Sequence, residues 1–151
     1  KKHDITDADI RALVAGTTVE NVEGFHFSNL KLTSNADETI TATVTMINQE
    51  AETVDLLANG QGSVEAIFNA IDKFFNQTVR LDTFNIDAVT EGIDAQAAVN
   101  VTVENVDTDT IFNATGIDFD VLKAAAIAYI NANIMVQKEN EGQLARLSEK
   151  D

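Results

Sequence analysis

Few residues of this sequence have side chains suited to chemistry, and they form no recognised catalytic set. There are two histidines, His3 and His26, and no cysteine. The lack of cysteine excludes disulfides, thiolate metal sites and cysteine nucleophiles. Asp107 and Asp109 suit a turn better than a cation site, and the acids of the 118–120 segment suit a helix N-terminus. No HExxH, EF-hand or P-loop pattern is present, so the sequence does not indicate a self-contained enzyme.

One glycine-containing turn suggests ligand binding. The run Asn59-Gly60-Gln61-Gly62-Ser63 falls between a predicted strand and a predicted helix. It matches half of a dinucleotide fingerprint, but Glu65 stands where the third glycine would be. Glycines in such a turn let a ligand approach the backbone, and the free N–H groups at a helix start favour a carboxylate. Turn geometry alone would explain the glycines equally well.

Hydrophobic periodicity predicts the elements that hold this turn. The clearest strand is 39–46, where apolar residues alternate with threonines so that one face enters a core. A helix follows the turn, with Ser63 as its expected N-cap, because apolar residues from Val64 to Phe75 recur at helical spacing. The remaining pattern predicts strands at 25–33, 53–58, 79–89, 95–106 and 110–115, a break at 116–120 and an alanine-rich helix at 121–135.

The order of elements repeats along the chain. A shift of 57 residues superposes Phe27 on Phe84 and Val64 on Val121 without a gap, and hydrophobic phase agrees throughout. The sequence therefore predicts an α+β fold of two βββα units related by a pseudo-twofold axis, each sheet covered by one helix. The expected segments are a linker with a short helix at 1–24, a domain at 25–136 with repeats 25–76 and 77–136, and a polar tail or helical extension at 137–151.

Composition restricts the possible partners. The 151 residues carry 25 acids against 10 bases, a formal charge of −15. Nucleic-acid grooves and anionic membranes require clustered Lys and Arg, so neither partner is expected. No apolar run approaches the length that spans a bilayer, and the first residues do not resemble a signal peptide. We expect a cytoplasmic domain.

Three segments carry a family resemblance. Residues 59–66 resemble the NGxGPVDA signature of the C-terminal regulatory domain of 2-isopropylmalate synthase, residues 84–97 its YxIxAVTxGxDAQA segment, and residues 116–133 its GxDxDVxxASAxAYxxAxN helix. The first ten residues are similar to the linker that precedes this domain. Ser63 replaces the usual proline, Phe84 replaces tyrosine, and Ala125 stands where a small hydroxyl residue is common.

The resemblance implies feedback regulation by an amino acid. In this family a metal-dependent TIM barrel condenses acetyl-CoA with 2-oxoisovalerate, and leucine binds the regulatory domain at a homodimer interface. A barrel of about 250 residues does not fit in this chain, so we expect a fragment without catalytic activity, cofactor or metal of its own. The resemblance implies a set of effector-site residues, which includes acids suited to the ammonium group of the amino acid: Asn59, Gly60, Gly62, Val64, Glu65, Leu81, Phe84, Ala88, Asp94, Ala95 and Val121.

These residues suggest how leucine would be held. Leu81, Phe84, Ala88 and Val121 offer apolar surface for a branched side chain. Backbone N–H groups near the glycine turn suit the α-carboxylate, and Glu65 or Asp94 suits the ammonium group. Two alternatives remain at this stage: an isoleucine-sensing domain of citramalate synthase, whose ligand differs only by the position of a methyl group, and a dimerisation domain without a ligand.

Overall fold

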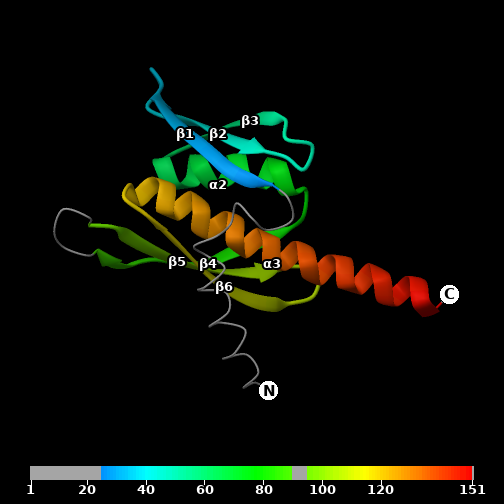
Figure 1. Ribbon diagram of the computed structural model, residues 1–151. Helices are drawn as coiled ribbons and strands as arrows, with labels where there is room; N and C mark the ends of the chain where they lie inside the picture. Colours follow the sequence, from blue (N-terminus) through cyan, green and yellow to red (C-terminus); the bar gives the residue numbers. More distant parts are fainter. Residues whose placement is uncertain (1–24, 90–94, 151) are drawn as a thin grey trace.

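The computed structural model describes residues 25–89 and 95–150 (Figure 1). The expected linker helix in 1–24 and residue Asp94 lie outside the described residues. The elements are β1 (His26–Ser34), β2 (Ile40–Ile47), β3 (Thr53–Gly60), α2 (Ser63–Phe75), β4 (Val79–Val89), β5 (Ala97–Asn105), β6 (Thr110–Asp118) and α3 (Val121–Lys150). The predicted α+β fold of two βββα units is confirmed.

Each unit contains a three-stranded antiparallel sheet with the second strand in the centre. The strand orders are β1-β2-β3 and β4-β5-β6. In β2 the alternating residues Ala42, Val44 and Met46 are buried, as predicted, while Ile40 is half-buried. Val44 pairs with Leu30 on one side and Leu56 on the other. In β5 the equivalent residue, Val101, pairs with Phe84 and Ala114. Val44 and Val101, which the 57-residue shift superposes, are thus both fully buried on a central strand, although their strand partners are not equivalent residues.

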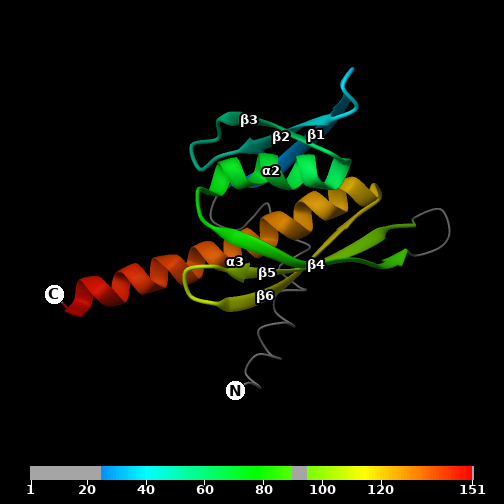
Figure 2. The same ribbon diagram turned by 180° about the vertical axis from the view of Figure 1, so that it is seen from behind.

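The two helices lie between the two sheets, as Figures 1 and 2 show from opposite sides. α2 packs on β2 and β3, α3 packs on β5 and β6, and the two helices contact each other. Burial of the inner sheet faces and of both helices forms one core between the sheets, which is the main stabilising term. Neither α2 nor α3, the helices that the structure describes, is long and apolar enough to span a membrane.

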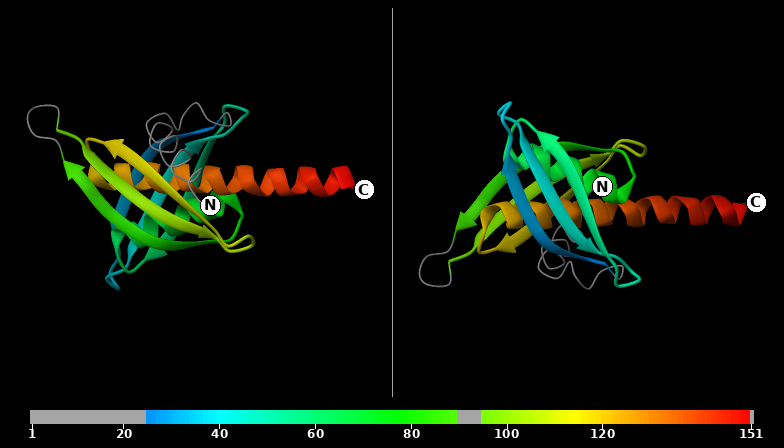
Figure 3. Two further views of the ribbon diagram at one scale, coloured as in Figure 1. Left: turned by 90° about the horizontal axis from the view of Figure 1, so that it is seen from below. Right: turned by 90° about the horizontal axis from the view of Figure 1, so that it is seen from above.

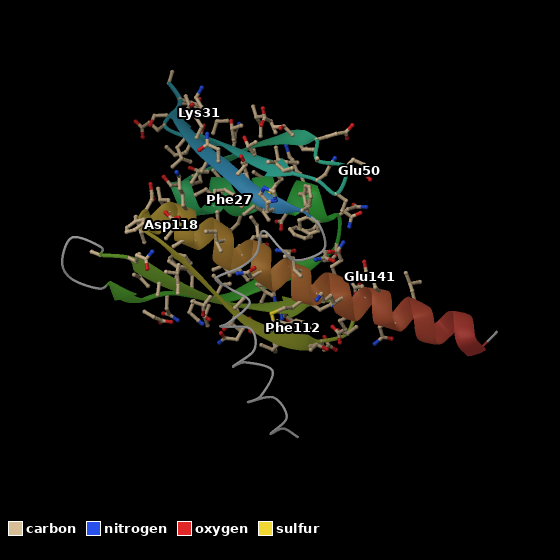
Figure 4. The ribbon with its side chains drawn as sticks, viewed as in Figure 1. Phe27, Lys31, Glu50, Phe112, Asp118 and Glu141 are labelled. Atoms are coloured by element: carbon tan, nitrogen blue, oxygen red, sulfur yellow. The ribbon has the colours of Figure 1, made fainter. Side chains whose placement is uncertain are left out.

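Gly116 lies within β6, although the sequence predicted a break at 116–120. A Cβ atom on Gly116 would lie 2.2 Å from the carbonyl oxygen of Ala124 and 2.4 Å from the nitrogen of Ala128. The glycine therefore serves close packing of strand against helix, and the buried alanines of α3 complete that contact. The chain turns from β6 into α3 only after Asp118, which is labelled in Figure 4.

α3 continues well past the sheets, as the views from below and above show (Figure 3). Residues 137–150, expected as a polar tail or extension, are helical. Fully buried Asn105 anchors the start of this part, because its Nδ2 donates to Oε1 of Glu139 and to Oδ1 of Asn140, both at 2.9 Å. Thr110 also donates to Oε2 of Glu139, at 2.7 Å. The β5–β6 hairpin thus fixes the direction in which α3 leaves the core.

Candidate functional site

A cavity of about 410 Å³ opens between α2, β4 and α3. Its walls combine apolar surface with a few polar groups, which is typical of a small-molecule site. The lining residues are Val64, Glu65, Phe68, Asn69 and Asp72 of α2, Val79, Arg80 and Leu81 of β4, and Tyr129 of α3. Residues from both repeats therefore contribute to one cavity.

The polar residues of α2 lie along one side of the helix. Glu65, Asn69 and Asp72 follow the spacing i, i+4 and i+7, which places them on one face. The Oε1 atom of Glu65 accepts the backbone N–H of Gln61 at 2.6 Å. The Nδ2 atom of Asn69 donates to the carbonyl oxygen of Asn59 at 3.0 Å. These contacts tie the glycine turn to the face of α2 that borders the cavity.

Tyr129 and Asp72 form the wall furthest along α2 from the glycine turn. The Tyr129 hydroxyl donates to Oδ1 of Asp72 at 2.7 Å. Burial raises the pKa of the Asp72 carboxyl, while this hydrogen bond lowers that pKa and reduces the shift. Burial also raises the pKa of Tyr129, and the neighbouring carboxylate raises it further. The tyrosine is therefore a hydrogen-bond donor here, and not a proton-transfer group at neutral pH.

Gly60 and Gly62 differ in whether the structure requires a glycine at their positions. A Cβ on Gly60 would lie 2.5 Å from the nitrogen of Ala66, so packing against α2 requires glycine there. A Cβ on Gly62 would meet nothing within 4 Å. The backbone of Gly62 is extended, with φ −140° and ψ 175°, a conformation open to any residue. Neither packing nor backbone conformation requires a glycine at position 62.

The N-cap of α2 is Gly62, so the prediction that Ser63 caps the helix is wrong. Ser63 is the first helical residue, where its side chain is past the position from which a cap reaches the free N–H groups. Gly62 makes no side-chain cap hydrogen bond. The first N–H groups of α2 have no intrahelical partner, and the N-cap residue, a glycine, has no side chain to accept from them. These N–H groups therefore favour an anion.

The structure brings some of the expected site residues together and separates others. Val64, Glu65 and Leu81 line the cavity. Phe84 lies behind the cavity wall, where its ring contacts the ring of Phe68 edge-on at a centroid distance of 6.1 Å. Asn59 and Gly60 end strand β3, and Gly62 is the N-cap of α2. Ala88 lies on β4 opposite Ala98, and neither Ala95 nor Val121 lines the cavity.

The cavity also contains residues that the sequence did not identify. They are Phe68, Asn69, Asp72, Val79, Arg80 and Tyr129. The polar spacing of Glu65, Asn69 and Asp72 on an otherwise apolar helix was a usable signal for two of them. The position of Tyr129 depends on how α3 crosses α2, which periodicity does not reveal. Among the residues that the structure describes, no group of three or more His, Asp or Glu side chains is arranged to hold a metal.

Comparison with known families identifies the domain. The family model described as the LeuA allosteric (dimerisation) domain matches residues 4–136. The chain belongs to this family. Similar proteins include the 2-isopropylmalate synthases of Streptococcus gallolyticus, 70% identical over 97% of this chain, of Lactococcus lactis subsp. lactis, 51% identical over 100%, and of Listeria monocytogenes serotype 4b, 36% identical over 87%. This LeuA allosteric domain spans only 26–29% of the length of these relatives.

Proposed function

We propose that this chain is the regulatory domain of a 2-isopropylmalate synthase and that it binds L-leucine as a feedback effector. Membership of the LeuA allosteric domain family and the names of the similar proteins support the parent enzyme. The main support for a ligand site is the cavity next to the N-terminus of α2. Packing does not require a glycine at position 62, the N-cap of this helix. A glycine at a position where packing does not require one suits close approach by a ligand.

Leucine fits this cavity with its head group at the start of α2. The free N–H groups beyond Gly62 receive the α-carboxylate, and the carboxylate of Glu65 holds the ammonium group. The isobutyl group packs on Val64 and Leu81, with Phe84 behind Phe68. Apolar contact provides much of the binding energy, and the polar contacts select an amino acid over a hydrocarbon.

A second copy of the chain completes the site in this proposal. Leu81, which lines the cavity, is 40% exposed, and Ile86, further along β4, is 53% exposed. A homodimer that covers them also encloses the ligand. In the parent enzyme, the divalent metal, acetyl-CoA and the condensation with 2-oxoisovalerate belong to a catalytic TIM barrel outside this chain, and the whole protein acts in the cytoplasm.

Calorimetric titration with L-leucine, L-isoleucine and L-valine, together with the mass in solution, tests the proposal. A dimer that prefers leucine is the expected result. Preference for isoleucine would assign the domain to a citramalate synthase. A well-folded dimer that binds none of the three would leave a dimerisation domain without a ligand, and leucine regulation would be rejected.

A further inference from the structure

Asp72 and Tyr129 meet at a special place in the fold. They are 57 residues apart, which is also the shift that superposes the two repeats. Asp72 of α2 and Tyr129 of α3 are therefore equivalent residues of the two units. Equivalent residues can touch only on the axis that relates them, so the hydrogen bond between Asp72 and Tyr129 lies on the pseudo-twofold axis.

The same pair determines the shape of the cavity wall. The Tyr129 ring stacks on Phe68, with centroids 4.1 Å apart and planes 9° apart. Phe68 in turn meets Phe84 edge-on. The three rings come from α3, α2 and β4, so this row of aromatic contacts connects the two repeats beside the cavity. A shift of α3 along α2 would change both the ring stack and the width of the cavity.

We propose that the Asp72–Tyr129 hydrogen bond positions the two repeats around the effector cavity and thereby sets the affinity for the amino acid. This inference rests on the proposed function. Tyr129 acts as a positioning residue. Its hydroxyl is bonded to Asp72, and its ring supports Phe68, which lines the cavity. The domain with this bond formed binds the effector better, and effector binding in turn favours the bonded arrangement.

The charge of Asp72 gives this role a measurable signature. A hydrogen bond to a carboxylate is about twice as strong as one to a neutral acceptor. Two other charged residues line the same cavity: Glu65, on the same face of α2 as Asp72, and Arg80 on β4, which is paired with Glu104. Because burial raises the pKa of Asp72, its carboxylate becomes protonated earlier during acidification than an exposed aspartate. Effector affinity should then fall as the pH falls through that raised pKa.

Three variants of the 151-residue chain separate positioning from stability. Tyr129→Phe keeps the stacked ring and removes the hydroxyl. Asp72→Asn keeps an acceptor oxygen and removes the charge. Thr45→Val is the matched control, because the Thr45 hydroxyl donates to the Asp55 carboxylate at the same 2.7 Å but on the exposed face of the first sheet. Leucine affinity is measured by calorimetry from neutral pH to about pH 4, and folding by circular dichroism.

The expected result is a specific loss of affinity. Tyr129→Phe should bind leucine about tenfold more weakly, the equivalent of one charge-assisted hydrogen bond. Asp72→Asn should lose the pH dependence over the acid range, and Thr45→Val should match the parent chain. A folded Tyr129→Phe with unchanged affinity would overturn the inference and leave the leucine site intact. If the parent chain binds no leucine, the proposed function fails first and this inference fails with it.

Discussion

Substitution of the two glycines in the turn should give opposite results. Gly62→Asp introduces a preferred N-cap residue and a negative charge at the positive end of α2. Its expected effect on folding is a gain of about 0.5–1 kcal/mol, roughly 1–4 °C in Tm for a domain of this size. Gly60→Ala places a Cβ 2.5 Å from the backbone of Ala66, so it should cost about 1–3 kcal/mol, or roughly 2–12 °C.

The effect on binding should be the reverse for Gly62→Asp. In the proposed site its carboxylate lies near the α-carboxylate of leucine. Two such charges about 4 Å apart repel by about 1–4 kcal/mol between water and a protein surface, which weakens binding by about 5- to 1,000-fold. Gly62→Asn is the matched control, because it caps the helix without a charge and should lose much less affinity.

Thermal melts and leucine titrations of the same three variants test this reasoning. The expected pattern is a Gly62→Asp protein that melts higher than the parent and binds leucine much more weakly. A stable Gly62→Asp protein with unchanged affinity would refute the placement of the carboxylate at the start of α2. If Gly62→Asp unfolds while Gly60→Ala does not, the structural reasons given for the two glycines are wrong.

Three further predictions follow from the packing and charges. Gly116→Ala should destabilise the fold by about 1–3 kcal/mol or more, because the added Cβ meets the rigid backbone of α3 at 2.2 Å; denaturant unfolding measures this. Asp72→Asn should raise Tm at pH 7, because burial raises the pKa of Asp72 and its charged form, present above that pKa, destabilises the folded state. The gain in Tm should shrink as the pH falls through the raised pKa, where Asp72 itself becomes neutral. Leu81→Ala should weaken leucine binding by about tenfold, because the Leu81 side chain forms part of the cavity wall; calorimetry measures this effect.

The sequence determined the secondary structure and the duplication, because both depend on short-range periodicity. The alternation in β2 and β5 and the apolar stripe of α2 were visible in the residues themselves. A shift of 57 residues was enough to predict two equivalent sheets and helices. The family resemblance also predicted an effector site that includes Val64, Glu65 and Leu81. These three residues line the cavity, and their contact with a ligand stays a prediction.

Only the tertiary structure decided which residues meet across the repeats. The Asp72–Tyr129 hydrogen bond and the Phe68 stack depend on how α2 crosses α3, a long-range packing relation that no local pattern specifies. The same holds for the glycines. Gly60, Gly62 and Gly116 are alike in sequence, but only Gly60 and Gly116 face a neighbouring backbone closely enough to exclude a Cβ. What a glycine is for depends on the atoms that surround it, and those atoms come from other parts of the chain.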